Sequence, residues 1–276
     1  MTLNDKLNSS IDTANSLLCI GLDPVIEKLP ARFQSSETPL FDFCKYIIDE
    51  AHEFVMGFKP NSAFFEAYGA SGIDQLQKTC AYIRSINPEL FIILDAKRAD
   101  IGNTNEAYIK YSFEYLGADA ITLHPYLGRE AIQPFLDQVD KGSIILCRTS
   151  NPGAGEFQDL VIQGDSRLRG NDTCSLYQYV ATQVSQKWNT NNNCMLVVGA
   201  TYPEELAQVR KIVGDMPILV PGIGAQGGDL EKTLKAGLTP DKKGLIITVS
   251  RAVIYAENPR EEAQKMKDIV NNYRLL

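Results

Sequence analysis

Eight short apolar runs recur along the whole chain, and this rhythm constrains the fold more than any other feature. Each run is rich in aliphatic and β-branched side chains and leads into polar or glycine-rich residues. Continuous apolar runs of this length are typical of parallel strands that are buried on both faces. The predicted strands are residues 17–22, 54–58, 90–94, 118–123, 143–147, 194–198, 217–220 and 244–249.

Segments with helical spacing separate these strands. Apolar residues recur every three or four positions in residues 41–53, 74–86, 103–116, 204–213 and 260–270. Asn103 and Asp229 stand where the N-caps of two such helices belong. The alternation predicts an α/β fold, a closed (β/α)8 TIM barrel, with a doubly wound parallel sheet as the alternative. A length of 276 residues suits one barrel domain over 1–276.

One segment interrupts the rhythm between the fifth and sixth predicted strands. Residues 156–173 lack a clear period and are rich in polar and turn-forming residues. Such segments are typical of surface loops that a fold tolerates. We therefore expect a surface insertion near 157–173, of which the N-terminal end alone is a candidate active-site lid.

Composition excludes several classes of function. The net charge is −7 and no basic stretch is present, which argues against a nucleic-acid binder but leaves room for a small phosphorylated ligand. The sequence has no signal-peptide pattern and no apolar run long enough to span a membrane. Six cysteines without a C-x-x-C pair predict reduced thiols and a cytoplasmic enzyme.

The two histidines, His52 and His124, make a histidine-based triad or a histidine-rich zinc site improbable. His52 lies within a helical pattern, and His124 follows the fourth predicted strand. We expect His124 to have a packing or hydrogen-bonding role beside the pocket.

Charged and polar side chains follow most of the predicted strands. Catalytic residues of a TIM barrel lie at the carboxyl ends of its strands, which meet at one face. The first three strands lead into Asp23, Lys59, Asn61, Asp95, Lys97 and Asp100, and the fifth, seventh and eighth into Thr149, Ser150, Asn151, Pro221, Gln226, Ser250 and Arg251. Two lysines and three aspartates therefore converge on one rim. A structural salt bridge is the alternative for each one, but all five together favour a reactive site.

The segment LDAKRADIGNT carries the densest pattern. Asp95 and Lys97 are two residues apart, so on a strand their side chains point to the same face. Asp100 lies three residues further on, where the strand turns into a helix. At the end of the third strand of a barrel, this D-x-K-x-x-D pattern predicts alternating charges around one site.

A phosphate site is predicted after the last two strands. VPGIGAQGG leads from the seventh strand through glycines whose amides can approach an anion, and a helix follows at Asp229. Arg251 follows the eighth strand with a guanidinium suited to bidentate phosphate contact, and Ser250 precedes it. These two loops are the usual phosphate position in this fold.

Several of these motifs together resemble one family. GLDP, GFKPNSAFFE, LDAKRADIGNT, RTSNPGAGE, VPGIGAQGG and VSRA occur in that order. They resemble the orotidine 5'-phosphate (OMP) decarboxylases, in particular the longer (type 2) branch. The resemblance covers roughly residues 17–256 apart from the segment at about 157–173, with no departure at a catalytic position.

The resemblance implies a carboxy-lyase of pyrimidine biosynthesis that converts OMP to UMP and CO2 without a cofactor or metal. It implies that Lys97 protonates the product carbon and that Asp95, Lys59 and Asp100 complete the charged group. It also implies a homodimer. The remaining implied contacts are Asp100, Ile101 and Thr104 in the partner's site, Asp23 and Asn61 at the ribose, Thr149 and Ser150 at the pyrimidine, and Gln226, Arg251 and Pro221 around the phosphate.

Two other functions stay open at this point. A Mg²⁺-dependent decarboxylase or aldolase of the same superfamily, acting on a keto-sugar phosphate, also uses a D-x-K-x-x-D pattern. It would carry a glutamate after the second strand, where this chain has FKPNS. A barrel that only binds a nucleotide is the third possibility, because fold does not determine function.

Overall fold

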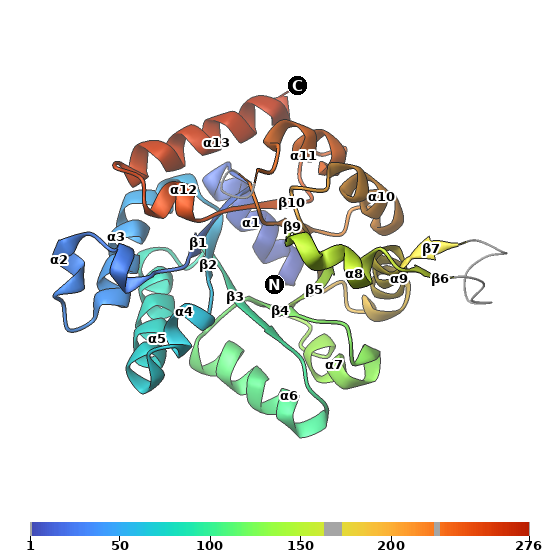
Figure 1. Ribbon diagram of the computed structural model, residues 1–276, viewed down its shortest axis with the longest axis horizontal. Coiled ribbons are helices and arrows are strands. Elements are labelled where there is room, and N and C mark those ends of the chain that lie inside the picture. The colour runs from blue at the N-terminus through green and yellow to red at the C-terminus, as the bar shows by residue number, and fades with distance from the viewer. Residues whose placement is uncertain (1, 163–172, 224–226, 276) are drawn as a thin grey trace.

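Eight parallel strands close into a barrel in the computed structural model, which describes residues 2–162, 173–223 and 227–275 (Figure 1). Around the barrel the order is β1 (Leu18–Leu22), β2 (Gly57–Pro60), β3 (Phe91–Arg98), β4 (Ala120–Leu123), β5 (Gly142–Arg148), β8 (Cys194–Val198), β9 (Ile218–Val220) and β10 (Leu245–Val249). β1 pairs with both β2 and β10, so the sheet has no edge. The predicted TIM barrel is confirmed, and the doubly wound sheet is excluded.

Helices surround the barrel (Figure 1). The described α-helices are α1 (Leu3–Ala14), α2 (Ala31–Gln34), α3 (Pro39–Ala51), α4 (Ala63–Glu66), α5 (Gly69–Ile86), α6 (Gly102–Ile109), α7 (Gly128–Leu136), α8 (Gly155–Gln158), α9 (Leu176–Gln183), α10 (Pro203–Val213), α11 (Leu230–Gly237), α12 (Arg251–Ile254) and α13 (Pro259–Leu275). Short 3-10 turns are η1 (Ile26–Lys28), η2 (His52–Phe54) and η4 (Pro152–Ala154), and π-helical turns are η3 (Lys110–Tyr115) and η5 (Val184–Trp188). Within the described ranges no helix is long and apolar enough to cross a membrane.

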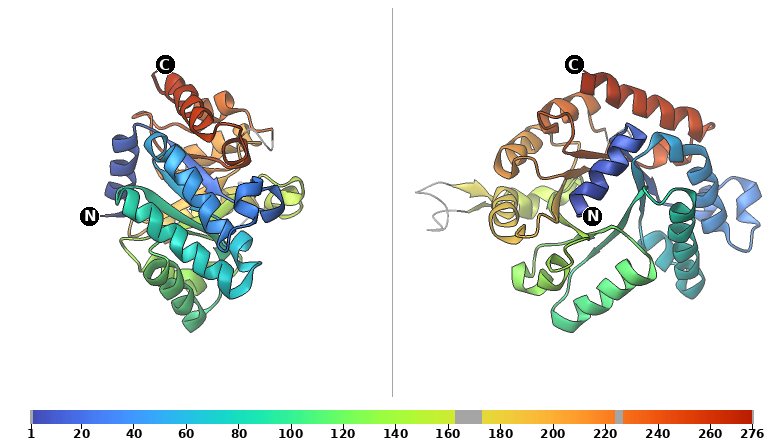
Figure 2. Two further views of the ribbon diagram at one scale, coloured as in Figure 1. Left: turned by 90° about the vertical axis from the view of Figure 1, so that its left-hand side faces the viewer. Right: turned by 180° about the vertical axis from the view of Figure 1, so that it is seen from behind.

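Helix α1 covers the amino end of the barrel. Thr2 caps it, since the Thr2 hydroxyl accepts the Asp5 N–H and the Asp5 carboxylate accepts the Thr2 N–H. Lys6 forms an ion pair with Asp119 directly before β4, and Asp12 pairs with a lysine shortly before β10 at 2.7 Å. Seen from behind, α1 lies across the centre of the barrel (Figure 2). The opposite, carboxyl end of the strands is therefore the end left for a functional site.

The core explains why the strand runs are apolar along their whole length. Every residue of β1, β4, β8 and β10 is buried, because one face of each strand fills the barrel and the other packs against helices. Asp119, at the amino end of the barrel, is a charged residue whose partners are all structural. Its carboxylate accepts hydrogen bonds from Arg84 Nη2 at 2.8 Å and from Ile92 N at 2.8 Å, and it also forms an ion pair with Lys6. A buried carboxylate in this fold thus need not be catalytic.

Four predicted boundaries, in three elements, are wrong. β2 begins at Gly57, because Phe54 lies in the turn η2, and it runs on to Pro60, so Lys59 lies inside the strand and not after it. β3 continues through Asp95 and Lys97 to Arg98. Ile101, not Asn103, is the N-cap of α6. In contrast, Asp229 caps α11 as predicted, accepting the N–H of the third helical residue at 3.1 Å.

A small antiparallel ribbon leaves the barrel within the segment that interrupts the rhythm. β6 (Val161–Ile162) pairs with β7 (Cys174–Ser175) and projects to one side (Figure 1). Residues 163–172 lie outside the described residues, so the insertion near 157–173 stays a prediction. The described flanks are consistent with a surface position because Val161 is 64% exposed.

Candidate active site

Three charged side chains meet at the carboxyl ends of β2 and β3. Lys59 Nζ lies 2.7 Å from Asp95 Oδ2, and Lys97 Nζ lies 2.6 Å from Asp95 Oδ1. We call these three residues the Lys59–Asp95–Lys97 array. A neutral side chain completes the carboxylate's contacts, because Thr122 Oγ1 donates to Asp95 Oδ1 at 2.9 Å. Both carboxylate oxygens are thus occupied by donors.

The members of the array differ in exposure. The side chains of Lys59 and Asp95 are 7% and 10% exposed, whereas that of Lys97 is 50% exposed. Lys59 and Asp95 therefore form a buried ion pair. Lys97 is the member of the array whose side chain is accessible to a bound molecule.

Burial and charge act in opposite directions on the two buried groups. Burial by itself would lower the pKa of Lys59, but the carboxylates of Asp95 and Asp23 outweigh it and hold that pKa above its ordinary value. Burial by itself would raise the pKa of Asp95, but the ammonium groups of Lys59 and Lys97 hold that pKa below its usual range. Lys59 and Asp95 are consequently both charged over the physiological pH range.

The backbone of Lys97 is strained. Lys97 has φ +47°, in the left-handed region that side chains other than glycine rarely adopt. The pairing of β3 with β4 shifts register between Leu94 and Arg98, so the strand bulges at this point. The predicted contact between Lys97 and Asp95 is confirmed, although the strand is irregular there. Such a backbone costs about 1–3 kcal/mol and is concentrated at functional sites.

Asp23 and Asn61 border the array. The Asp23 side chain is half-buried, and its Oδ1 atom has no hydrogen-bond partner among the described residues. Tyr255 holds the loop after β1 because its hydroxyl donates to Asp23 O at 3.3 Å and accepts from Val25 N at 3.0 Å. Asn61 forms a parallel bridge with Asp95, so it lies beside the array at the end of β2.

Asp100 lies apart from the array within the chain. Its carboxylate accepts the N–H of Ile101 at 2.7 Å, and its own N–H donates to Asn105 Oδ1 at 2.9 Å. Among the described residues, Asp100 forms no hydrogen bond or ion pair with the array. Ile101 is 60% exposed, and Thr104 is half-buried near the start of α6. The predicted convergence of all five charged residues therefore stays a prediction where Asp100 is concerned.

The loop after β5 carries Thr149 and Ser150. Thr149 N donates to Gln158 Oε1 at 2.9 Å, which ties the loop to α8. Backbone packing sets the position of Ser150, because a Cβ atom added to Gly199 would lie 2.8 Å from Ser150 Cα. The residue after β8 must therefore be a glycine for the two loops to approach this closely.

The loops after β9 and β10 surround the predicted phosphate position. Pro221 leads into Gly222 and Gly227, which have φ values of +100° and +81°, as expected of a glycine loop. Gln226 lies outside the described residues, so its predicted contact stays a prediction. Arg251 begins α12 and is exposed.

Ser250 lies close to the end of β1. A Cβ atom at Gly21 would lie 2.8 Å from Ser250 Cβ and 3.4 Å from Asp23 Oδ2. Ser250 Oγ is buried and has no partner among the described residues. Ser250 and the predicted ribose residue Asp23 thus lie near each other at the β1–β10 pair.

Comparisons with known proteins agree with this geometry. The family model described as "Orotidine 5'-phosphate decarboxylase / HUMPS family" matches residues 16–266. The orotidine 5'-phosphate decarboxylase of Janthinobacterium sp. (strain Marseille) is 46% identical over 280 residues, covering 99% of each chain. That of Cellvibrio japonicus is 47% identical over 276 residues, covering 99% of this chain and 97% of the relative. The solved structure of Leishmania donovani OMP decarboxylase superposes with a TM-score of 0.87 at 37% identity, covering all of both chains.

The chain belongs to the orotidine 5'-phosphate decarboxylase / HUMPS family. The resemblance predicted from six short motifs is therefore confirmed over almost the whole chain. Membership also agrees with the observed barrel, because the superposition covers every strand that bears a member of the array.

His124 forms a hydrogen bond, as expected from the sequence. Its Nε2 atom lies 3.2 Å from Ala99 O, and it links the end of β4 to the segment between Lys97 and Asp100. The ring is half-buried. The contact supports the backbone that follows the array.

Thr122 and Arg148 lie near the site although no role was predicted for either of them from the sequence, and Arg148 is the first residue of the RTSNPGAGE motif. Arg148, at the end of β5, is 2% exposed, pairs with Asp159 at 3.0 Å, and has its guanidinium carbon 3.8 Å from the ring centre of Tyr202. It therefore braces the loop that carries Ser150. A polar residue inside an otherwise apolar strand is the sequence signal common to Thr122 and Arg148.

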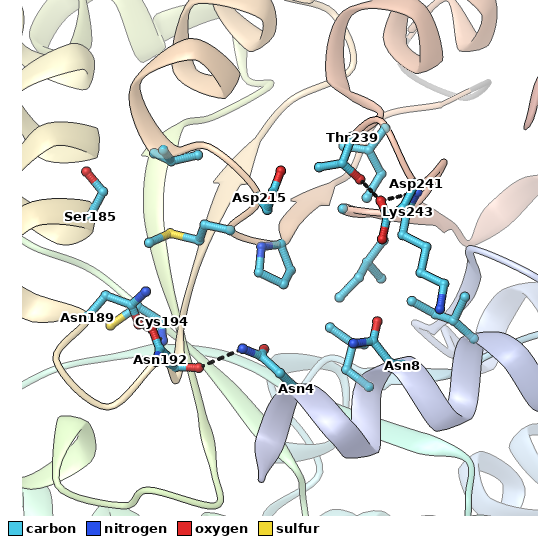
Figure 3. Close-up of a pocket in the computed structure, with 18 residues that line it drawn as sticks. Asn4, Asn8, Ser185, Asn189, Asn192, Cys194, Asp215, Thr239, Asp241 and Lys243 are labelled. Atoms are coloured by element: carbon cyan, nitrogen blue, oxygen red, sulfur yellow. Dashed lines mark hydrogen bonds between the residues drawn. The ribbon is translucent and has the colours of Figure 1, made fainter.

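A second concave region lies at the opposite end of the barrel from the array. Figure 3 shows this cleft of about 400 Å³ between α1 and the amino ends of β8, β9 and β10. Asn4 and Asn8 line it from α1, and Asn4 Nδ2 donates to Asn192 O at 3.1 Å. None of the predicted substrate-binding residues lines it. Across the described ranges, no three His, Cys, Asp or Glu side chains are grouped to hold a metal ion.

Proposed function

We propose that this chain decarboxylates OMP to UMP and CO2 by means of the Lys59–Asp95–Lys97 array. The observation that carries the proposal is the arrangement of the array in a member of this family. A half-exposed ammonium, Lys97, is held 2.6 Å from a carboxylate that is itself buried and paired with a second ammonium. A positive group is thereby fixed at the open end of the barrel before any substrate binds.

The chemistry requires such a fixed charge. When the bond between C6 of OMP and its carboxylate carbon breaks, the electron pair stays on C6, and no neighbouring group delocalises it. The Lys97 ammonium stabilises this charge and then transfers a proton to C6, which completes UMP. Lys97 recovers its proton from solvent. Preorganised charges act strongly in such a site because they need no reorganisation during the reaction.

Asp95 and Lys59 hold Lys97 in place. Asp95 is buried, and Lys59 offsets its charge from the Oδ2 side of the carboxylate. In the proposed mechanism Asp95 would face the substrate carboxylate. Repulsion between the two carboxylates is a ground-state contribution that would add to the electrostatic one.

The other predicted residues would bind the remainder of OMP. Arg251, with Gln226 and Pro221, would surround the phosphate, and Ser250 lies next to Arg251. The exposed position of Arg251 leaves its guanidinium accessible to a ligand. The Asp23 Oδ1 atom lacks a partner among the described residues, so it is available to accept a ribose hydroxyl, with Asn61 beside it.

The pyrimidine ring would lie against the loop after β5. Ser150, with Thr149, offers a hydroxyl and backbone groups to the ring. Phosphate binding at a distance from C6 can order this loop over the ring and exclude water, since remote binding energy is available for closure.

We also propose a homodimer in which each chain completes its partner's site. Among the described residues, Asp100 forms no hydrogen bond or ion pair with the array of its own chain. Ile101 beside it is a large apolar side chain that is 60% exposed, and Thr104 lies one helical turn further along. An exposed apolar residue next to an unused carboxylate fits a segment that enters another subunit's site.

Lys59 argues against the metal-dependent alternative within the family. The metal-dependent enzyme would carry a metal-binding glutamate after the second strand. This chain has Lys59 in that segment, and its ammonium lies 2.7 Å from Asp95. A divalent cation there would be repelled by two ammonium groups. The relatives from Janthinobacterium sp. and Cellvibrio japonicus are both named orotidine 5'-phosphate decarboxylase.

One assay tests the proposal. OMP loss is followed by ultraviolet absorbance with and without a chelator, and UMP is identified by chromatography. We expect equal turnover in both arms. Turnover that the chelator abolishes would favour the metal-dependent enzyme, and OMP binding without turnover would favour a regulatory nucleotide binder.

Mixed dimers test the shared site. Asp100→Asn and Lys97→Ala homodimers should both be nearly inactive. With subunit exchange at equal amounts, about half of the dimers are mixed, given a two-fold interface. In each mixed dimer one site collects both substitutions and the other is intact, so activity should recover to roughly a quarter of wild type. Mixed dimers shown by native mass spectrometry without recovered activity would refute the shared site.

A cytoplasmic location is proposed from the cysteines. Cys19, Cys44, Cys80, Cys147 and Cys194 are buried free thiols. Burial raises the pKa of Cys19 and Cys80 to about 12, so these thiols are unreactive apolar side chains. A chain of this kind suits a reducing compartment.

A further inference from the structure

Thr122 uses the whole hydrogen-bonding capacity of its hydroxyl at the array. It lies in β4 and is 1% exposed. Its Oγ1 atom donates to Asp95 Oδ1 at 2.9 Å and accepts the N–H groups of Ala96 at 3.1 Å and Lys97 at 3.0 Å. A hydroxyl has one donor and two acceptor positions, so none is left over.

The donated bond acts on the orientation of the carboxylate. Oδ1 of Asp95 is the oxygen that receives the Lys97 ammonium, and Oδ2 is the one that receives Lys59. Thr122 is the third donor to the carboxylate and the second at Oδ1, and because it lies on the neighbouring strand it prevents the carboxylate from rotating about its Cβ–Cγ bond. The direction in which Lys97 Nζ is held depends on that rotation.

The two accepted bonds act on the backbone of Lys97. The pairing of β3 with β4 is interrupted between Leu94 and Arg98, so the N–H groups of Ala96 and Lys97 cannot use the regular ladder. Thr122 Oγ1 replaces the missing acceptor, which buried N–H groups require. It thereby stabilises the bulge in which Lys97 has φ +47°.

We propose that Thr122 is a positioning residue for the decarboxylation: through Asp95 and the Lys97 backbone it sets where the Lys97 ammonium meets C6. The inference rests on the proposed function. Thr122 is buried beneath the array and does not touch the substrate, so it acts only through these two residues.

A purely structural role makes a different prediction. Valine has nearly the shape of threonine, so a packing role alone would be preserved in Thr122→Val. The positioning role depends on the hydroxyl, so it would be lost in Thr122→Val and preserved in Thr122→Ser. The activity of the two variants therefore separates the two roles.

The experiment compares kcat and KM for OMP in the wild type, Thr122→Val and Thr122→Ser. We expect kcat to fall about 10- to 100-fold in Thr122→Val, the loss that removing hydrogen bonds to a charged group usually causes. KM should change by less than about twofold, because no substrate contact is removed. Thr122→Ser should keep kcat within about threefold of wild type, because it retains the hydroxyl bonds.

A matched control makes the same change elsewhere. Thr79 in α5 is fully buried, and its hydroxyl donates within its own helix to Gln75 O at 2.8 Å. Thr79→Val should leave kcat unchanged. If Thr122→Val does not fold, Thr122→Cys takes its place, because a thiol is a weaker donor and acceptor of similar size. Its kcat should then fall below that of Thr122→Ser.

A second measurement isolates the proton transfer. By microscopic reversibility, an enzyme that protonates C6 also exchanges the C6 hydrogen of UMP for deuterium in D2O. We expect the exchange rate, followed by proton NMR, to fall in Thr122→Val in parallel with kcat.

Four results would overturn the inference. One is a folded Thr122→Val enzyme with kcat within about threefold of wild type, well under the expected loss. Another is an equal loss of kcat in Thr79→Val, and a third is a Thr122→Ser enzyme no better than Thr122→Val. A wild-type chain that does not decarboxylate OMP would overturn the proposed function and this inference with it, whereas the other three leave the function intact.

Discussion

Replacing Lys59 by methionine tests the buried half of the array. Methionine fills a similar volume, so the main loss is the ammonium that pairs with Asp95 at 2.7 Å. At an effective dielectric constant of about 20, that distance corresponds to an attraction of about 6 kcal/mol. The desolvation of the ammonium offsets part of it, and the unpaired carboxylate left behind remains buried. We expect the free energy of unfolding at neutral pH to fall by about 3–5 kcal/mol.

The pH dependence of this loss has a definite sign. In the wild type, the folded-state pKa of Asp95 lies below the unfolded value of about 3.9, so its contribution is present above that pH and is lost as the pH falls. In Lys59→Met, burial still acts on Asp95 but the Lys59 ammonium no longer opposes it, so the folded-state pKa of Asp95 rises. In acid, protonation of Asp95 then removes the buried, unpaired charge and reduces the loss of stability in the variant. The difference in stability between variant and wild type should be smaller at pH about 4.5 than at pH about 7.5.

The assay is urea unfolding followed by far-ultraviolet circular dichroism at both pH values. Lys78→Met is the matched control, because Lys78 and Asp74 form an exposed pair at 2.7 Å that should contribute less than about 1 kcal/mol. In the double variant Lys59→Met with Asp95→Asn, the buried charge is gone, so stability should exceed that of Lys59→Met alone. A loss in Lys59→Met no larger than in the control, or a double variant that is less stable still, would refute the reasoning.

Three further substitutions test the site. Lys97→Ala should lower kcat at least about 100-fold, because it removes the proton donor. The free energy of unfolding should change by less than about 1 kcal/mol, because the Lys97 side chain is half exposed. A smaller loss of kcat would contradict the role of Lys97 as proton donor. Arg251→Ala should raise KM for OMP but leave turnover of orotidine, which lacks the phosphate, unchanged; equal losses on both substrates would mean that Arg251 supports the barrel. Gly199→Ala should raise KM, because its Cβ would lie 2.9 Å from Ser150 N and displace that loop; an unchanged KM would show that the loop adapts.

The sequence determined the barrel and most of the array. Alternating apolar strands and amphipathic helices are local patterns, and only a closed parallel sheet buries eight such strands on both faces. Lys59, Asp95 and Lys97 could be assigned to one rim because parallel strands place their carboxyl ends together. The spacing of Asp95 and Lys97 predicted their contact, which the structure shows at 2.6 Å.

The tertiary structure alone decided how these residues are held. The bulge at Lys97 arises where β3 and β4 fall out of register, and register depends on pairing between segments distant in the sequence. The same pairing brings Thr122 to Asp95, a contact 27 residues apart in the chain. The start of β2 at Gly57 and the separation of Asp100 from the array likewise follow from how neighbouring elements pack. Local periodicity reports which face of an element is buried, but the partners that it meets there are set by the closed barrel as a whole.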